Sequence, residues 1–239
     1  MALVIADEEG FEAVSMRSVA RALGCGTMTL YHYVRNKDDL IALMDDALMA
    51  ELLVPEDEFP DHWRDALTAI ARRTRDAWRR HPWAFDAIRG ARIGPNGLRH
   101  FEQSLAAVAN LDVPLEQRIQ ILTMVDDYTL GFSVRDALLE PTADAEEWRP
   151  VLDYMRRQIQ TGEFPNVEEF IGDGGFEQAL ERARAARDSG DERFERGLAL
   201  LLDGMEQEIA AKKKPATSRR GGRSSRARGR SRDGGARRA

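Results

Sequence analysis

Several features of other protein classes are missing from this chain of 239 residues. Its single cysteine, Cys25, excludes an intramolecular disulfide and indicates a reducing compartment. No apolar run approaches the roughly 20 residues that a membrane-spanning helix needs. The start of the chain also lacks the basic segment of a signal peptide, because acidic residues follow as early as Asp7. We therefore expect a cytoplasmic protein that does not enter a membrane.

The usual residue patterns of enzymes and metal sites are missing as well. The four histidines lie far apart, without the four-residue spacing of a helical metal site, and Cys25 has no second cysteine as a partner. The sequence contains neither a glycine-rich phosphate loop nor a Gly-x-Ser-x-Gly elbow. The adjacent Asp126 and Asp127 would point to different faces of a helix. We predict that the chain is not an enzyme and needs no metal and no cofactor.

Helical periodicity is what the chain does contain, and it predicts an all-α fold. The pattern shows no strand alternation of useful length and no internal repeat. Pro55, Pro60 and the acidic residues between them mark a domain boundary. We expect a small domain over 1–53, a larger helical domain over 54–211 and a tail over 212–239.

The larger domain is predicted to be helical almost throughout. The apolar spacing favours helices over 61–80, 82–89, 98–111, 114–139, 146–161 and 191–211. Proline and glycine predict a turn at 94–97 and a loop at 162–175. The segment 176–187 is expected to be a charged helix or partly disordered.

The most informative stretch spans residues 15–39. Met16, Val19, Ala20 and Leu23 recur at helical spacing behind Ser15, a good N-cap. Gly24, Cys25 and Gly26 then form a tight turn, where a small residue is needed. A second helix, capped by Thr27, points Leu30 and Val34 inward. A helix, a tight turn and a second helix form a helix-turn-helix, whose second helix can enter the major groove of DNA.

Helical hairpins with a glycine turn are common, so the exposed face decides between DNA binding and a purely structural role. A face meant only for solvent usually carries Glu, Lys and Ala, whereas this one carries Met28, Thr29, Tyr31, His32 and Tyr33. Threonine, tyrosine and histidine can bond phosphates and base edges. The composition of this face favours DNA binding.

The same stretch resembles the tetracycline-repressor (TetR) family of bacterial regulators. The resemblance is strongest over 29–40, where Leu-Tyr, two variable residues, Val and Asn-Lys precede a leucine of the next helix. It runs from Ala2 to about Leu53, fades, and returns over 193–205, which is similar to the last helix of a tetracycline-repressor-type C-terminal domain. It implies a ligand-responsive regulator, by default a repressor, that binds double-stranded DNA.

Matched to the family motif, Arg17 is a candidate for a bidentate contact to guanine, and Lys37 for a phosphate clamp. Ser15 could bond a phosphate beside them. The remaining predicted contacts come from the exposed face of the second helix. Its candidates are Thr27, Met28, Thr29, Tyr31, His32 and Tyr33.

The resemblance also implies a homodimer, in which 114–139 and 191–211 pair with their copies in a four-helix bundle. The wide apolar stripe of the last helix is the candidate contact, although it could also pack within one subunit. Its members are Phe194, Leu198, Leu201, Leu202, Met205 and Ile209. A two-fold dimer would present two recognition helices to successive major grooves of a pseudo-palindromic operator.

A small apolar or aromatic effector is expected to bind among the helices of the larger domain and to shift the spacing of the two DNA-binding domains. Aromatic and methionine residues at helical spacing are more often core than pocket. The apolar candidates are Trp78, Trp83, Phe85, Phe101, Met124, Phe132, Trp148 and Met155. The polar candidates are Arg89, His100, Asp127 and Tyr128.

Charge is distributed unevenly along the chain. Residues 212–239 hold 12 Lys plus Arg and one acid, whereas the other 211 residues hold 23 basic and 40 acidic residues. Rich in Arg, Gly and Ser, the tail is expected to be disordered, and either contacts nucleic-acid phosphates or only keeps the chain in solution. The family resemblance does not extend to it.

Two observations keep an alternative open. Residues 1–53 carry four basic residues against nine acids, and Met1 falls inside the first helical pattern, so the family's usual basic arm is missing or lies upstream. The alternative is a helical protein that binds a small molecule or a partner without specific operator binding.

Overall fold

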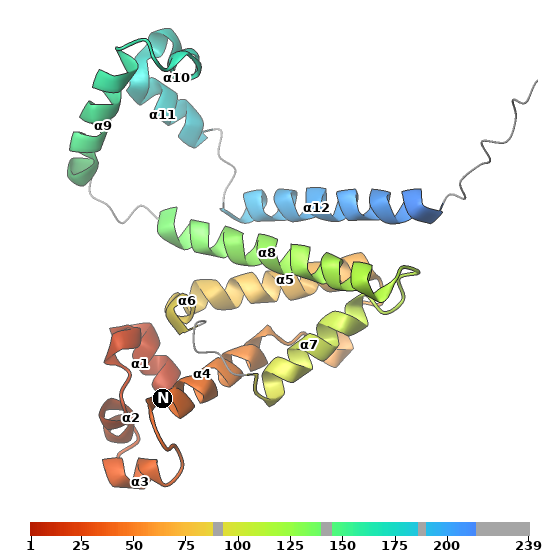
Figure 1. Cartoon of the computed structure of the whole chain (residues 1–239). Helices are drawn as coiled ribbons and strands as arrows, with labels where there is room; N and C mark the ends of the chain where they lie inside the picture. Colours follow the sequence, from red (N-terminus) through yellow and green to blue (C-terminus); the bar gives the residue numbers. More distant parts are fainter. Residues whose placement is uncertain (88–92, 140–144, 186–189, 214–239) are drawn as a thin grey trace, which may run out of the picture.

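The computed structural model describes residues 1–87, 93–139, 145–185 and 190–213, and every regular element within these ranges is a helix. The all-α class is thereby confirmed. In Figure 1 the short N-terminal helices form a head at one end of the molecule, and longer helices form the body. The head and its connector comprise α1 (Ala2–Glu9), η1 (Phe11–Ala13), α2 (Met16–Ala22), α3 (Thr27–Tyr31) and α4 (Lys37–Leu52).

The body begins after the short turn η2 (Glu56–Glu58). Figure 1 shows α5, α8 and α12 running side by side through it, with α7 crossing beside them and α9 to α11 forming a separate lobe. Its helices are α5 (Trp63–Arg80), α6 (Ala84–Ala87), α7 (Pro95–Ala107), α8 (Leu115–Leu139), α9 (Ala145–Ile159), α10 (Pro165–Ile171), η4 (Gly172–Gly174), α11 (Gly175–Ala185) and α12 (Gly190–Lys213).

The head is built around an apolar core that α4 completes. Leu30 and Val34 are buried as predicted, and they share this core with Val19 of α2 and with Leu40 and Met44 of α4. Because α4 also runs toward α5 and α7, the helix that closes the head core connects it to the body.

Two details of the predicted helix-turn-helix are wrong. Leu23 is half exposed, because α2 ends at Ala22 and its apolar face stops one turn early. The N-cap of α3 is Gly26 and not Thr27. Because glycine has no side chain, this end of the helix has no side-chain cap. Thr27 is the first residue of the helix.

The apolar stripe of α12 faces the interior of the same chain. Phe194, Leu198 and Leu202 are almost completely buried, and they pack in one cluster with Leu67 and Ile70 of α5. The second possibility for this stripe, packing within one subunit, is therefore what the structure shows. Any contact of α8 and α12 with another subunit would use their outer faces.

The predicted turn at 94–97 is the first turn of α7. Pro95 occupies the first helical position, where the missing N–H costs nothing. The carboxylate of Asp46 on α4 accepts hydrogen bonds from the backbone N–H of Asn96, at 2.7 Å, and from that of Gly97, at 3.3 Å. A Cβ at Gly94 would overlap the same carboxylate. The cap of α7 thus comes from a helix about fifty residues earlier in the chain.

Two further predictions for the second half of the chain need correction. The expected loop 162–175 contains α10, which begins at Pro165 and is bounded by the positive-φ residues Gly162 and Gly172. The last helix extends to Lys213, two residues into the predicted tail, and Lys212 pairs with Glu208 one turn earlier. Residues 214–239 lie outside the described part.

Candidate functional site

The helix-turn-helix is fixed by local hydrogen bonds. The Ser15 hydroxyl accepts a bond from the Ser18 N–H at 3.0 Å, and the Ser18 hydroxyl accepts one from the Ser15 N–H at 2.9 Å, which forms a capping box at the start of α2. Gly24 has a φ of +67° and turns the chain between α2 and α3, a conformation that glycine adopts at little cost. The Cys25 N–H closes the turn on the carbonyl of Ala20 at 3.0 Å.

The outer face of α3 presents side chains with no apparent structural role. Met28 is 75% exposed and Tyr33 is 82% exposed, although both are large. Thr29, Tyr31 and His32 are exposed between them, and Thr27 is half-buried. Large apolar and aromatic side chains held in solvent beside hydroxyl groups match the needs of base-edge and phosphate contacts.

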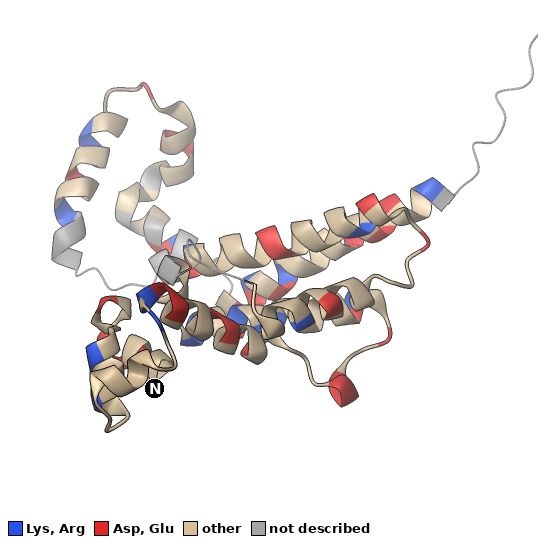
Figure 2. Cartoon of the chain, turned by 60° about the horizontal axis from the view of Figure 1, so that its bottom comes forward, with Lys and Arg blue, Asp and Glu red and all other residues tan. Residues whose placement is uncertain are grey.

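The cations near this face differ in how far they are engaged. Arg17 is exposed at the start of α2, where its guanidinium can reach a partner. Arg35 pairs with Asp39 one turn later at 2.9 Å. The Lys37 ammonium lies 5.8 Å from the centre of the Phe11 ring, which holds it beside the head. Figure 2 shows few basic residues on the head, so any DNA contact there depends on a small number of cations.

Ser15 has a structural role that the sequence prediction did not include. Its hydroxyl accepts the Ser18 N–H, so the residue is committed to the cap of α2. The Ser15 and Ser18 hydroxyl oxygens also lie 3.0 Å apart, and the Ser18 hydroxyl donates to the carbonyl of Ala13 at 2.8 Å. A phosphate bond donated by Ser15 would therefore replace its contact with the Ser18 hydroxyl.

A polar cluster joins the head to the body. Asp7 of α1 accepts a bond from the Trp83 indole N–H at 2.6 Å and contacts His81 Nδ1 at 2.7 Å. His81 Nε2 lies 3.2 Å from a carboxylate oxygen of Glu51, which also pairs with Arg80. His81 and Trp83 are both buried. The sequence analysis missed this cluster, because its members come from three helices and the turn after α5.

Three aromatic residues predicted for the effector pocket belong instead to this junction. Trp78 and Phe85 stack with ring centres 4.4 Å apart, and Trp83 stacks on Phe11 at 6.0 Å. All three pack with the head core. Their positions favour a role in holding the head against α5 and α6.

Tyr128 and Phe132, also predicted for the pocket, lie together in the body. The Tyr128 hydroxyl donates to the carbonyl of Phe194 at 2.8 Å, and its burial raises the pKa of the phenol. A Cβ at Gly197 would overlap that hydroxyl, so the missing side chain makes room for it. The ring centre of Phe132 is 5.2 Å from that of Phe194. The sequence analysis assigned Phe194 to the apolar stripe and did not include it in a site.

Two arginines complete this aromatic group, and neither was predicted. The Arg75 guanidinium carbon is 4.8 Å from the centre of Phe194 and 5.3 Å from that of Phe132. Arg193 lies 4.8 Å from Phe132 and pairs with Asp136 at 2.7 Å. An arginine inside an amphipathic helix pattern is ordinarily a surface residue, so no pattern in the sequence places Arg75 in the core.

His100 is a further polar candidate in the body. It is half-buried on α7, and among the described residues its Nδ1 is buried without a hydrogen-bond partner. Burial lowers the pKa of His100, which favours the neutral ring. A neutral imidazole with a free nitrogen can accept or donate one hydrogen bond to a ligand.

The remaining ligand candidates are not brought together. Phe101 is 52% exposed on α7, and Met124 and Asp127 are exposed on α8. Met155 is exposed on α9, in the separate lobe. Arg89 and the side chain of Trp148 lie outside the described part.

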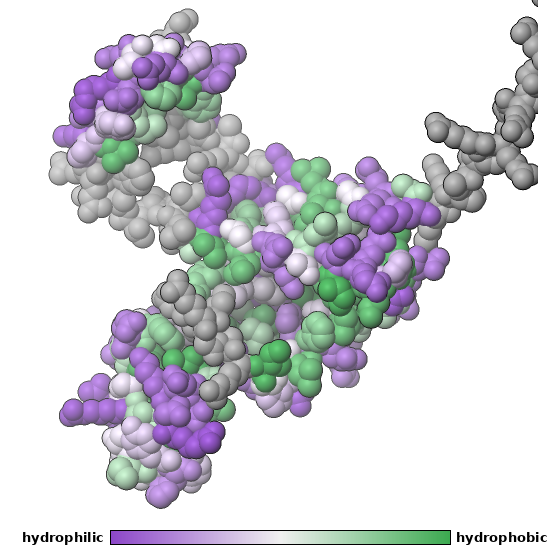
Figure 3. Space-filling model, viewed as in Figure 1, coloured by the Kyte–Doolittle hydropathy of each residue, from purple (hydrophilic) through white to green (hydrophobic). Residues whose placement is uncertain are grey.

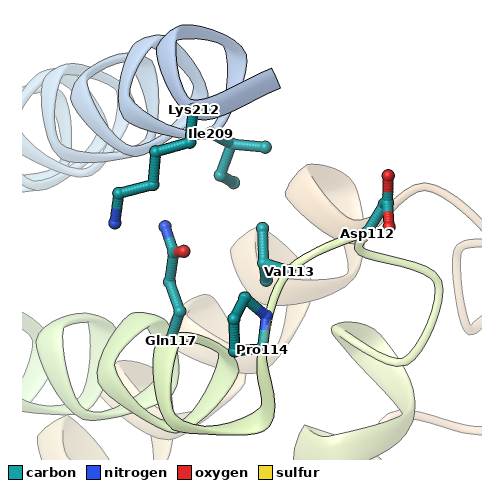
Figure 4. Close-up of a pocket in the computed structure, with 6 residues that line it drawn as sticks. All are labelled: Asp112, Val113, Pro114, Gln117, Ile209 and Lys212. Carbon is teal, nitrogen blue, oxygen red and sulfur yellow. The ribbon is translucent and has the colours of Figure 1, made fainter. Parts of the chain in front are cut away.

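An open pocket of about 660 Å³ lies at the end of the body away from the head. Figure 4 shows Gln117 of α8 and Lys212 of α12 extending toward each other across it. None of the predicted ligand residues contributes to its wall. It is lined by Asp112, Val113, Pro114, Gln117, Ile209 and Lys212.

The described ranges contain no cluster of three or more His, Cys, Asp or Glu side chains that could hold a metal ion. None of their helices combines the length and hydropathy needed to cross a membrane.

The chain matches two family models. Residues 2–44 match the model described as bacterial regulatory proteins, tetR family, and residues 54–209 match the tetracyclin repressor-like C-terminal domain. The HTH-type transcriptional repressor DrrR1 of Streptomyces coeruleorubidus is 32% identical over 220 residues, covering 89% of this chain and 77% of that protein. The tetracycline repressor protein class E of Escherichia coli is 26% identical over 215 residues, covering 89% of this chain and 90% of that repressor.

A solved structure shares the fold. The Streptomyces coelicolor TetR family protein ActR in complex with actinorhodin superposes with a TM-score of 0.65 at 26% identity, covering 87% of this chain and 94% of that one.

Proposed function

This chain belongs to the tetracycline-repressor family of bacterial regulatory proteins, and on that premise we propose that it is a dimeric repressor released from its operator by a small effector. The observation that carries the proposal is the outer face of α3. Met28 and Tyr31 are exposed on this short helix, and Tyr33 is exposed two residues after its end, while the inner residue Leu30 is buried. A folded protein gains nothing from such a face unless another molecule covers it.

The proposed DNA contacts fall into two groups. Arg17, the α3 residues Met28, Thr29 and Tyr31, and His32 and Tyr33 directly after α3 would meet base edges and nearby phosphates in the major groove. Lys37, Ser15 and Thr27 would contact the backbone and fix the register. The first group would decide which sequence is bound, and the second how tightly any sequence is bound.

We further propose that two copies associate through the outer faces of α8 and α12. Leu115, Ile119 and Leu130 are exposed on α8, and Leu200 is 66% exposed on α12. Figure 3 shows apolar surface on this part of the body. Since the inner stripe of α12 is already buried, these residues are the apolar surface left for a partner. The two-fold axis would set the spacing of the two recognition helices.

The effector would bind in the body and change the spacing of the heads. Tyr128 and Phe132 pack together in the body and would supply an aromatic wall. His100 on α7 would supply a separate polar group, and the junction at Asp7, His81 and Trp83 would offer a path to the head. A ligand that prefers one head spacing shifts the dimer toward it, and the affinity for an operator with fixed half-site spacing falls. ActR, a relative by structure, has been solved with actinorhodin bound.

The test is binding of the purified protein to DNA flanking its own gene, by fluorescence anisotropy at two salt concentrations, with and without residues 212–239. We expect saturable binding to one palindromic segment that survives removal of the tail, with a footprint of two half-sites. Binding that needs the tail, ignores sequence and collapses with salt would show that the head does not read DNA. It would favour a helical ligand- or partner-binding protein instead.

A further inference from the structure

The most unusual charge in the body is Arg75. Its side chain lies in the middle of α5 and is only 5% exposed, among the apolar residues that α5, α8 and α12 bury together. Burying a cation is costly unless it is paired and hydrogen-bonded. The faces of Phe132 and Phe194 on either side supply part of the compensation through cation–π contacts.

The counter-ion of Arg75 comes from an exposed position. Arg75 Nη2 donates to Asp191 Oδ1 at 2.6 Å, and the Asp191 side chain is 68% exposed. The same oxygen also accepts a bond from Arg79 at 2.9 Å, so one carboxylate oxygen serves two guanidiniums. Within the described residues, Nε of Arg75 is buried and has no hydrogen-bond partner. The guanidinium therefore has unused capacity for an anion.

The described ion pairs around Arg75 share their carboxylates. Arg75 and Arg79 both pair with Asp191, and Arg193 pairs with Asp136. Guanidinium and carboxylate groups match in a planar, two-bond geometry that the single Asp191 oxygen does not provide. A free carboxylate could take both Nη and Nε positions of Arg75, which Asp191 does not do.

We propose that Arg75 is the anchor for a carboxylate of the effector, and that Asp191 occupies this anion position in the unliganded protein. The effector class is then an aromatic carboxylate, with its acid on Arg75 and its ring beside Phe132, which is only half-buried. Binding exchanges an internal anion for an external one and breaks the Arg75–Asp191 bond between α5 and α12. This inference rests on the proposed function for its regulatory meaning, but the binding site itself is testable without DNA.

The alternative is that Arg75 and Asp191 only tie α5 to α12. Arg72 offers a matched control, because it lies one turn earlier on α5 and pairs with Glu195 of α12 through two bonds of 2.7 and 2.6 Å. That pair is exposed, so it ties the same helices together without a buried guanidinium.

The experiment titrates full-length protein with 1-naphthoate, and with the neutral 1-naphthamide as the matched probe, by calorimetry in the absence of DNA. We expect wild type to bind the naphthoate about tenfold more tightly than the amide, as a charged hydrogen bond implies. Arg75→Met should lose this preference, and Arg72→Met should keep it. Asp191→Asn should bind naphthoate more tightly than wild type, because the competing anion is gone.

Several results would overturn the proposal. It fails if naphthoate does not bind, if the amide binds equally well, or if Asp191→Asn weakens binding. It fails too if Arg75→Met lowers the melting temperature but leaves naphthoate affinity unchanged, which would mark a purely structural ion pair. If Arg75→Met does not fold, Arg75→Lys takes its place, because lysine keeps the charge but lacks the planar guanidinium. An operator titration of the same proteins without probe separates this failure from failure of the proposed repressor.

Discussion

The head and the body use their polar side chains in opposite ways. On the head, the outer face of α3 and Arg17 extend into solvent, and their capacity for contacts is largely unused. In the body, the arginines of α5 meet acids of α12 in succession, from Arg64 with Asp203 to Arg72 with Glu195 and Arg75 with Asp191. Substitutions on the head surface should therefore change DNA binding without changing stability. Substitutions in the body core should instead change stability.

The largest effect should come from Phe194→Ala. This side chain is fully buried between Phe132, Tyr128 and Arg75, and truncating a buried phenylalanine costs about 3–5 kcal/mol of unfolding free energy. Urea unfolding followed by circular dichroism measures it. Gln207→Ala, at an exposed position of the same helix, should stay within about 0.5 kcal/mol of wild type. Similar losses in both variants would refute the assignment of the body core.

Arg17→Ala tests the other side of the comparison. We expect a loss of about 1–3 kcal/mol in operator binding that is confined to one base position, because a bidentate arginine contact discriminates by that amount. The unfolding free energy should not change, since Arg17 is exposed. Anisotropy titrations against operators altered one base pair at a time provide the measurement. An equal loss on every variant operator would make Arg17 a phosphate contact.

The same contrast explains what the sequence could predict. The head follows from signals only a few residues apart: Ser15 as a cap, Gly24 in the turn, and Leu30 and Val34 four residues apart on the buried face. The long helices were also located well, and Pro114 marked the start of α8 to within one residue. These elements could be predicted because the residues that determine each of them are close together in the sequence.

The body site depends on contacts that no local pattern contains. Arg75 and Asp191 are 116 residues apart, and only the packing of α5 on α12 makes one the counter-ion of the other. The sequence proposes Trp78 and Phe132 as apolar candidates for one pocket, but apolar spacing does not say which helix covers each of them. Trp78 therefore belongs to the junction with the head, and Phe132 to the arginine cluster. The start of α7 was missed for the same reason, since its cap is Asp46.

The junction is where the two regions should respond together. Asp7→Asn keeps the shape of the side chain but removes the charge facing His81 and weakens the acceptor for the Trp83 N–H. We expect a loss of about 1–2 kcal/mol in stability, typical for a weakened charged hydrogen bond, together with weaker operator binding. Both are measured on one preparation, by urea unfolding and anisotropy. Glu8→Gln, at the exposed neighbouring position, is the control. A change in stability alone, or in operator binding alone, would show that the junction does not position the head for DNA binding.

Lys37→Ala should have a smaller effect that is uniform across sequences. A phosphate contact releases counter-ions, so its loss should reduce the slope of log K against log salt by about one. Anisotropy at four salt concentrations, on operator and on unrelated DNA, measures the slope. Arg21→Ala removes an exposed charge from α2 that is not assigned to the DNA face, and its slope should match wild type. A loss limited to the operator would place Lys37 among the base-reading residues.

The smallest effect concerns His100. Burial lowers the pKa of His100 in the folded protein below its unfolded value, so the folded state disfavours the charged ring. Its contribution is fully present above the unfolded pKa of about 6.5 and is lost as pH falls through that value toward the folded pKa. Wild type should therefore lose more unfolding free energy between pH 7.5 and 5.5 than His100→Gln does. If His100→Gln follows the wild-type curve, His100 is charged or solvated in the folded body and is not the neutral hydrogen-bonding group proposed for the effector site.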